Sequence, residues 1–471
     1  MKAGEQMTPD ADSARVRTAE ENPLGTEPIG KLLCRFAFPS CISLIVNALY
    51  NIVDQIFIGR GVGYLGNGAT NVILPVTVLA IGIGMLFGDG CSAFMSMQLG
   101  KKDEEAASAG AANTILCLIA SSILLCILTS LFLRPICMLC GATETILPYA
   151  MEYGRIIFLG LPFSMFTGGM SSIIRADGSP SYSMAGLLSG CLTNIVLDYI
   201  FVFPLDMGIA GAALATVIGQ AVNVLIFIGY FARFRHVRLT KSRWRIRPSF
   251  VGRICQLGAS SFILQMTVVV IMIVNNKLLV YWGALSKYGA DIPLTALGVT
   301  MKVNNILIAI MNGIGAGALP IIGYNYGAGN MDRVKQTIKL SVGTAMFCGV
   351  IATVCFQLFP GAIVSIFGTE SELYMEFGIL CLRIFLLLCV LDGLNYVLPT
   401  CFQAIGRPMY SVAASLIRQI IILIPAAVIL PFFIGVTGVL WAGPVAQGGA
   451  FIVNLFLLRT VLKQQNSSSC A

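Results

Sequence analysis

The chain has 471 residues, of which 57% are hydrophobic and only 11% are charged, and its mean hydropathy is +0.85. Soluble domains carry about 25% charged residues, so the composition excludes a water-soluble globular protein. The net charge of +8 is expected from basic loops between membrane spans, and no nucleic-acid partner is needed to explain it.

Residues 1–30 are polar, mixed in charge and expected to form a disordered cytoplasmic tail. They lack the apolar core of about 7 to 15 residues that a signal peptide needs, so no cleaved signal is expected. The hydrophobic segment that begins at Lys31 is therefore predicted to be an uncleaved membrane anchor.

Apolar runs between breaker residues predict twelve transmembrane helices, at 33–58, 70–97, 110–133, 147–172, 182–204, 208–232, 252–282, 293–322, 337–360, 374–402, 409–431 and 435–459. Twenty-two Lys and Arg residues fall in the tails and loops on one side of these helices, while the opposite loops hold only Arg60, Arg134 and Lys287. Because cytoplasmic loops are enriched in basic residues, both termini are predicted to be cytoplasmic.

The two halves of the chain resemble each other. "RADGSPSYS" after the fourth predicted helix matches "QAIGRPMYS" after the tenth at an offset of 228 residues, and "MGIAGAALATVIGQ" matches "IGVTGVLWAGPVAQ" at an offset of 227. Six helices per half make the halves parallel repeats, an architecture of secondary transporters. The sequence thus predicts an all-α polytopic membrane protein with two pseudo-symmetric six-helix lobes, divided into an N-terminal tail 1–30, an N-lobe 31–232, a basic cytoplasmic linker 233–251, a C-lobe 252–460 and a cytoplasmic C-terminal tail 461–471.

Two acidic residues lie deep within N-lobe helices, where a charge is expensive and usually functional. Asp54 shares one helix face with Asn47, and Asp198 shares one with Asn194. Two carboxylates backed by amides suit a site for Na⁺ or for an exchangeable proton, and Thr216 can add a hydroxyl. The alternative is that these groups only hold the bundle together.

The repeat provides an internal comparison for this pair of acids. Asp54 corresponds to Asn275, and Asp198 corresponds to Pro425 or Ala426. The C-lobe has therefore lost both carboxylates, which favours a cation-coupling site in the N-lobe.

The predicted C-lobe helices carry other charged residues: Asp392, Lys277 and Lys302. They are predicted to form a buried ion pair that stabilises a conformation or contacts substrate, and a purely structural pair is the alternative. Arg418 lies nearer a segment end and receives no role. Asp89, within "GDGCSA", is interpreted as lining a gate or as marking a close helix contact.

Other function classes find little support. The single histidine, His236, excludes histidine metal clusters and Ser-His or Cys-His catalytic pairs, so no enzyme is predicted. The lone "CMLC" of Cys137 and Cys140 has no second ligand pair, and no cofactor is expected beyond the coupling ion. A nucleotide-driven pump would need the G-x-x-x-x-G-K-[ST] motif, which is absent from the sequence.

Six motifs together resemble the multidrug and toxic compound extrusion (MATE) transporters, over residues 33 to 460: "LYNIVDQIFIGR", "IIRADGSPSYS", "CFQAIGRPMYS", "NIVLDYIF", "GIAGAALATVIGQ" and "GYNYGAGNMDRVK". The N-lobe acids suggest the DinF-like bacterial branch. This resemblance implies twelve helices in two lobes and export of cationic drugs in exchange for inward H⁺ or Na⁺. It places the cation site on Asp54, Asn194, Asp198 and Thr216, with Asn47 as a further ligand.

Another branch of that family uses carboxylates in helices 7 and 10. Asp392 matches the helix 10 position, whereas helix 7 here offers Gln265 and Asn275 but no acid. We therefore expect a secondary active multidrug efflux antiporter in a bacterial inner membrane, a monomer with small-molecule drugs or toxins and membrane lipids as partners. The alternative is a flippase for lipids or lipid-linked oligosaccharides, which would be expected to line its cavity with several cationic residues.

Overall fold

The computed structural model describes residues 22–237, 244–289, 291–366 and 372–468, and its regular structure in these ranges is entirely helical. Eleven of the described helical spans are long and apolar enough to cross a bilayer, and a pair of helices bent by 51° makes a twelfth. The predicted all-α membrane fold is confirmed. Most of the predicted N-terminal tail and the centre of the predicted linker lie outside the described residues.

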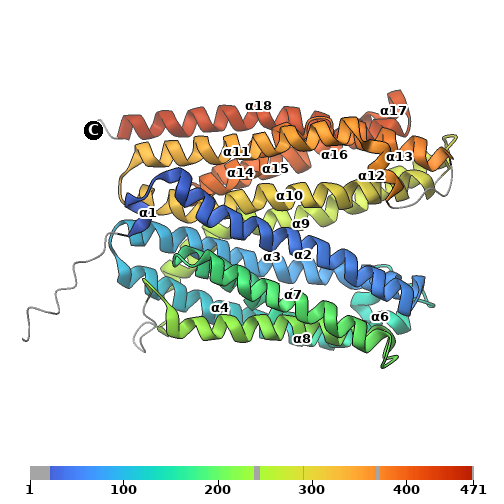
Figure 1. Cartoon of the computed structure of the whole chain (residues 1–471), viewed down its shortest axis with the longest axis horizontal. Coiled ribbons are helices and arrows are strands. Elements are labelled where there is room, and N and C mark those ends of the chain that lie inside the picture. Colours follow the sequence, from blue (N-terminus) through green and yellow to red (C-terminus); the bar gives the residue numbers. More distant parts are fainter. Residues whose placement is uncertain (1–21, 238–243, 290, 367–371, 469–471) are drawn as a thin grey trace, which may run out of the picture.

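The first half of the chain forms a bundle that we call the N-lobe. It fills one side of the molecule in Figure 1 and consists of α2 (Ile29–Gly61), α3 (Tyr64–Gly100), α4 (Glu104–Leu131), α5 (Leu133–Leu139), α6 (Leu147–Ala176), α7 (Pro180–Val202), α8 (Gly208–Gly229) and the short η2 (Tyr230–Arg233). 

The second half forms the C-lobe on the other side. Its helices are α9 (Pro248–Ala284), α10 (Asp291–Gly327), α11 (Met331–Leu358), α12 (Pro360–Ser365), α13 (Glu372–Phe385), α14 (Cys389–Ala404), α15 (Pro408–Leu416), the π-helix η4 (Ile417–Leu423), α16 (Ile424–Ile429), α17 (Pro431–Ile434) and α18 (Thr437–Ser468). The tenth predicted helix is thus split into α13 and α14, and the eleventh contains a π-helix.

The repeated loop between the fourth and fifth spans of each lobe has the same backbone form. Gly178 follows α6 with a φ of 89°, and Gly406 follows α14 with a φ of 77°. Glycine adopts this left-handed conformation at little cost. Pro180 and Pro408 then begin the next helices, where proline's fixed φ is favourable.

The lobes pack closely at the end of the bundle that carries α1 (Pro23–Thr26) and the end of α18 (Figure 1). Glycines allow backbones to touch there: a Cβ added at Gly313 would lie 2.6 Å from the Cys41 Cα, and one at Gly258 would overlap the Leu86 carbonyl oxygen. Gly100 and Gly327, which correspond in the repeat, each meet the backbone of the other's helix. The structure is therefore closed between the lobes at this end.

The segment before α2 joins this closed end and differs from the disordered tail expected for residues 1–30. Leu24 is buried, and its carbonyl accepts hydrogen bonds from Asn325 Nδ2 at 2.9 Å and from Arg333 Nη2 at 3.3 Å. Arg333 also donates to the Glu27 carbonyl at 2.7 Å. These bonds give residues 24–27 a fixed place on α10 and α11, and α2 begins at Ile29 rather than near residue 33.

Both described ends of the basic linker are held by the N-lobe. At the first end the buried Asp177 carboxylate accepts bonds from the Tyr230 hydroxyl at 2.7 Å and from the backbone N–H groups of Arg235 at 2.7 Å, His236 at 3.0 Å and Val237 at 3.2 Å. Burial raises the pKa of Asp177, and these hydrogen bonds oppose that rise.

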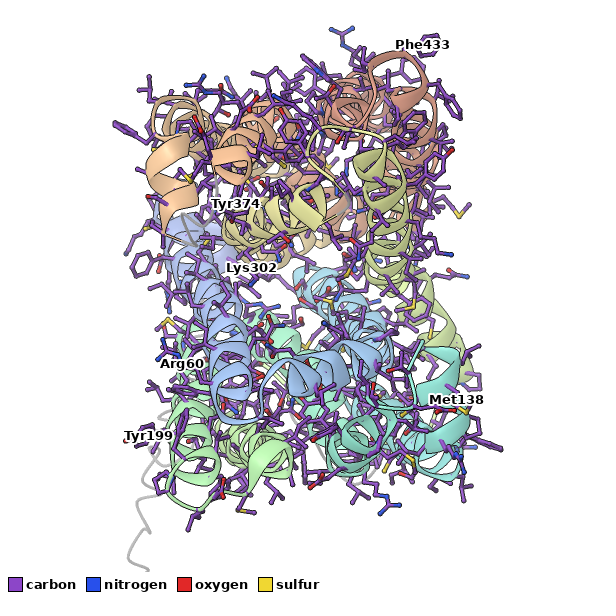
Figure 2. The ribbon with its side chains drawn as sticks, turned by 90° about the vertical axis from the view of Figure 1, so that its right-hand side faces the viewer. Arg60, Met138, Tyr199, Lys302, Tyr374 and Phe433 are labelled. Carbon is purple, nitrogen blue, oxygen red and sulfur yellow. The ribbon has the colours of Figure 1, made fainter. Side chains whose placement is uncertain are left out.

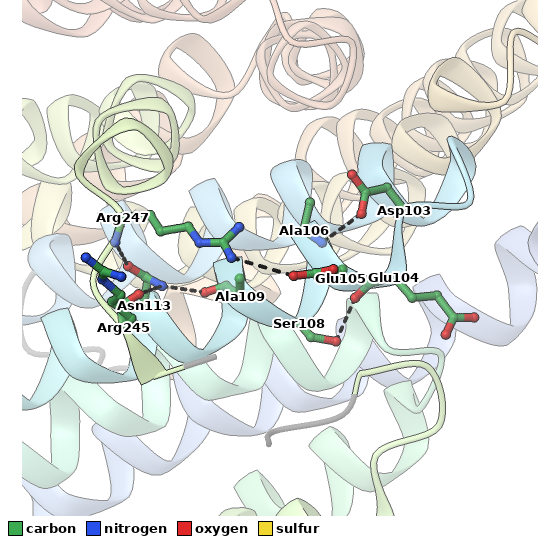
Figure 3. Close-up of polar contacts among 9 residues, drawn as sticks. All are labelled: Asp103, Glu104, Glu105, Ala106, Ser108, Ala109, Asn113, Arg245 and Arg247. Carbon is green, nitrogen blue, oxygen red and sulfur yellow. Dashed lines mark hydrogen bonds and ion pairs between the residues drawn. The ribbon is translucent and has the colours of Figure 1, made fainter. Parts of the chain in front are cut away.

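At the second end, the side chain of Asn113 on α4 forms hydrogen bonds with the backbones of Arg245 and Arg247 (Figure 3). Its Oδ1 accepts from Arg247 N at 2.7 Å, and its Nδ2 donates to Arg245 O at 3.3 Å. Arg247 also pairs with Glu105 at 3.6 Å. The C-lobe chain therefore leaves the N-lobe at Arg247, immediately before α9 begins at Pro248.

We expect Asp177→Asn to loosen the first anchor, because an amide nitrogen now faces backbone N–H donors. Leaving such buried donors unpaired costs about 1–3 kcal/mol, which should lower the unfolding temperature. Limited trypsin digestion followed by mass spectrometry should show faster cleavage after Arg235. The exposed Glu144→Gln serves as the control, and equal cleavage rates in both variants would contradict the anchoring role.

Candidate functional site

The structure brings the two N-lobe acids together. Asp54 of α2 is partly buried, Asp198 of α7 has no exposed surface, and their carboxyl groups interact directly. Each lies on the face that its helix turns toward the other. The spacing argument from the sequence therefore placed these two side chains in one site.

Amide and hydroxyl groups complete this site. Asn194, one turn before Asp198 on α7, donates a hydrogen bond from Nδ2 to Thr216 Oγ1 of α8 at 3.3 Å. Within the described residues, Asn194 Oδ1, Asp54 Oδ1 and both Asp198 carboxylate oxygens are buried without a hydrogen-bond donor. Four oxygen acceptors are thus unsatisfied in one place, an arrangement that suits a cation or a proton.

Among the residues that the structure describes, none supplies a counter-charge to this site. The ion pairs of the described chain involve other acids, and neither Asp54 nor Asp198 takes part in one. Two buried carboxylates with neither donors nor a cation are expensive when both are charged. The site therefore favours uptake of a positive charge from outside the chain.

Two tyrosines near the acids were not singled out by the sequence. The hydroxyls of Tyr50, one turn before Asp54 on α2, and Tyr153 of α6 both interact electrostatically with Asp54 and Asp198. Tyr50 stands within the quoted "LYNIVD" segment, where its helical spacing from Asp54 is a usable signal. Tyr153 lies in a different span and carries no such signal.

Apolar side chains cover the site on the side toward the end of α2. Phe57 and Phe203 meet edge-to-face with ring centroids 5.9 Å apart, and Ile58, Val202 and Ala212 form a small buried cluster. This layer shields the acids from water on that side and strengthens their electrostatic interactions.

The structure does not place Asn47 in the buried group. Asn47 is exposed and accepts a hydrogen bond from Asn51 Nδ2 at its own carbonyl, at 2.6 Å. Its position two turns from Asp54 leaves it beside the site rather than within it.

The C-lobe arrangement corrects the predicted ion pair. Asp392 is buried, but its cationic partner is Arg418 at 3.7 Å, whereas Lys277 and Lys302 are both exposed. The prediction that a lysine pairs with Asp392 is wrong. Arg418 was passed over as lying near a segment end, yet η4 turns it into the lobe, where it is 8% exposed.

The remaining C-lobe candidates do not gather around Asp392 as one polar site. Gln265 of α9 faces α3, where it borders Gly82 of the N-lobe, and Asn275 is buried further along α9. Figure 2 views the molecule from one end. Lys302 lies toward the middle of this view, whereas Arg60, Met138, Tyr199 and Phe433 lie nearer its edges.

Asp89 of α3 is bonded to α6 within the N-lobe, next to the closed contact with the C-lobe. It accepts a hydrogen bond from Ser172 Oγ at 2.6 Å, and Arg175 donates to the same hydroxyl at 2.8 Å. Its neighbour Gly90 lies against the Ile254 carbonyl of α9. The "GDGCSA" segment was interpreted either as lining a gate or as marking a close helix contact. The structure has a polar group, Asp89, directly beside a close helix contact at Gly90.

The model of the MatE family matches the chain in two stretches, 39–200 and 261–429, one in each half. Together they cover well over half of the chain. The chain belongs to the MatE family. The resemblance to MATE transporters is confirmed, and with it the assignment as a transporter rather than an enzyme.

Curated relatives of this MatE protein include the multidrug export protein MepA of Staphylococcus aureus (strain MSSA476), 27% identical over 451 residues, covering 93% of this chain and 96% of the relative. MepA of Staphylococcus haemolyticus (strain JCSC1435) is 27% identical over 446 residues and covers 91% and 93%.

Solved structures share the fold. An outward-facing multidrug resistance MATE family transporter of the MOP superfamily gives a TM-score of 0.89 at 22% identity, covering 94% of this chain and 98% of that one. A MOP superfamily transporter from Pyrococcus furiosus Vc1 (DSM3638) gives 0.88 at 22% identity, with the same coverage. The two family stretches include Asp54, Asn194 and Asp198 but not Thr216.

Proposed function

We propose that this MatE protein is a secondary active antiporter that exports organic compounds, mostly cationic and amphipathic, in exchange for inward H⁺ or Na⁺. The observation that carries the proposal is the Asp54–Asp198 pair, whose carboxyl groups have no counter-cation among the described residues. Such a pair needs an exchangeable positive charge, and supplying or removing that charge changes the stability of the N-lobe arrangement.

In the proposed cycle, cation entry neutralises the acids and favours one arrangement of the lobes, and cargo bound between the lobes leaves by the opposite one. A proton that moves down about 100 mV and one pH unit supplies roughly 2.3 and 1.4 kcal/mol. That energy supports a gradient of a few hundredfold for a neutral cargo at one-to-one exchange.

Either ion is compatible with the donor set. Na⁺ would be held by the oxygens of Asp54, Asn194, Asp198 and Thr216, which are the hard ligands that such an ion prefers. A proton would be held by one of the two carboxyls, whose charge Tyr50 and Tyr153 sense electrostatically. Asn47, exposed beside the pair, is positioned to meet an entering ion.

Relatives named as multidrug export proteins support small organic compounds as the cargo. We place this chain as a monomer in a bacterial inner membrane, in contact with its lipids. We also propose that both termini are cytoplasmic. The described ends lie on the same side of the bundle, and the loops predicted to be on that side are rich in Lys and Arg, which supports this orientation.

The test is transport in proteoliposomes with a pH gradient alone and then with a Na⁺ gradient alone, using ethidium as substrate. We expect one of the two gradients to drive ethidium accumulation well above that in protein-free vesicles, and this result also identifies the ion. Transport that neither gradient drives, together with scrambling of fluorescent lipids, would contradict antiport and support the flippase.

A further inference from the structure

The two lobes treat their buried acids in opposite ways. In the described part of the chain, Asp54 and Asp198 of the N-lobe have no cationic partner, whereas Asp392 of the C-lobe lies 3.7 Å from the Arg418 guanidinium. Both side chains of the C-lobe pair are nearly inaccessible, with 4% and 10% of their surfaces exposed. The C-lobe carboxylate therefore has a positively charged side chain of the same protein beside it.

Arg418 is held in place by an aromatic ring as well as by the acid. Its guanidinium carbon lies 4.0 Å from the centre of the Tyr396 ring, which is close for a cation–π contact. Arginine remains charged under all physiological conditions, so this cation cannot leave by deprotonation. The contact also restrains the side chain against rotation away from Asp392.

One amide binds Asp392 directly, and two more amides extend this contact between α14 and α18. Gln447 of α18 donates from Nε2 to Asp392 Oδ2 at 2.9 Å. Asn395 donates to the Gln447 carbonyl at 3.1 Å and accepts from Asn454 Nδ2 at 3.0 Å. These bonds tie α14 to α18. Asp392 Oδ2 thus has a hydrogen-bond donor, whereas Oδ1 accepts no hydrogen bond within the described residues and lies 3.7 Å from Arg418 Nη1.

The backbone around the pair is irregular in two places. Asp392 lies in the first turn of α14, just after the break at residues 386–388, where the positive end of the helix dipole adds to the charge of Arg418. Arg418 lies in the π-helix η4, whose extra residue per turn shifts the direction of side chains. The helix break therefore lies beside Asp392, and the π-helix contains Arg418.

The repeat shows that this arginine is particular to the C-lobe. Arg418 stands ten residues after Pro408, and the residue ten positions after Pro180 is Gly190. A Cβ at Gly190 would lie 2.9 Å from the Gly219 carbonyl oxygen of α8, so the N-lobe has no room for a side chain there. One lobe has an arginine where the other has a close helix contact.

We propose that Arg418 is a tethered cation that permanently occupies the C-lobe carboxylate and thereby confines exchangeable-ion binding to the N-lobe. The inference rests on the proposed antiport, whose coupling site it restricts to Asp54 and Asp198. Arg418 then acts as a positioning residue that sets how many ions bind per chain, and the C-lobe moves without gaining or losing a charge.

The test counts ions bound to the purified full-length protein, by radiolabelled Na⁺ binding and by proton titration. Arg418→Met removes the tethered charge and leaves Asp392 without a cation, so this variant should bind one more ion per chain than the wild type. The double variant Arg418→Met/Asp392→Asn should return to the wild-type count. A folded Arg418→Met protein with an unchanged count overturns the proposal.

Asp392→Asn provides a second measurement that does not depend on the folding of Arg418→Met. Its ion count should equal that of the wild type, with an affinity within about twofold, because the N-lobe site is untouched. Loss of an ion in this variant overturns the proposal. A wild type that binds no ion contradicts the proposed antiport instead, and a gain of one ion in Arg418→Met still supports the tethered cation in that case.

Discussion

Asp198→Asn and Asp54→Asn are each expected to abolish gradient-driven efflux, reducing ethidium transport in proteoliposomes to the rate of protein-free vesicles. Asparagine has nearly the shape of aspartate but can neither bind a proton at physiological pH nor supply the charge that holds Na⁺. The one carboxylate that remains binds an exchangeable cation more weakly than the pair does. Coupling therefore disappears, although the cargo route between the lobes is unchanged.

The same variants should remain folded, which separates a coupling defect from a folding defect. Replacing one of two adjacent buried carboxylates removes like-charge repulsion, so the unfolding temperature should be unchanged or higher. Glu152→Gln is the matched control, because Glu152 is an exposed acid on α6 of the same lobe. Wild-type efflux by both Asp54→Asn and Asp198→Asn would contradict the coupling site.

Gly258→Leu is expected to stop transport by a different route. A side chain at Gly258 of α9 would overlap the Leu86 carbonyl of α3, and backbone cannot move aside as a flexible side chain can. Overpacking of this kind costs about 1–3 kcal/mol or more. Gly258 and Leu86 belong to different lobes, so separating the lobes at this end removes the clash. The cost therefore shifts the population toward the arrangement open at this end, by roughly 5- to 150-fold.

Electron paramagnetic resonance distances between spin labels at Lys101→Cys and Asn330→Cys, one on each lobe, measure this shift. We expect longer distances in Gly258→Leu than in the unsubstituted background, together with loss of ethidium efflux. The matched control is Gly252→Leu, on the same helix, where an added Cβ meets nothing within 4 Å. Equal distances and equal efflux in the two leucine variants would show that the glycine contact does not govern closure.

Much of the fold was predictable because its signals are local. Apolar runs define the spans, and the glycine and proline of the "ADGSPSYS" and "AIGRPMYS" loops define matching turns in the two lobes. The break between α13 and α14 was not predictable, since the run 374–402 is apolar on both sides of Leu386–Leu388. The π-helix η4, which packs against α18 and is followed by Pro425, was likewise not predicted.

The candidate site divides in the same way. Helical spacing grouped Asp54 with its neighbours on α2 and Asp198 with Asn194 on α7, and the structure brings these faces together. Tyr153 interacts electrostatically with the acids from a third helix, and no periodicity in the sequence links it to them. Arg418 was missed because it lies nearer the end of its predicted helix than Lys277 and Lys302 do. The break before α14 and the π-helix η4 determine which cation lies beside Asp392.

The most direct test of the coupling site is whether substrate displaces an ion from it. Purified wild-type protein is titrated with ethidium while proton release is followed in weak buffer and Na⁺ release is followed with radiolabelled Na⁺. The account predicts that the wild type releases one kind of ion in proportion to the substrate bound, and that Asp198→Asn binds substrate without releasing it. Substrate binding without ion release in the wild type, or equal release in Asp198→Asn, would contradict it.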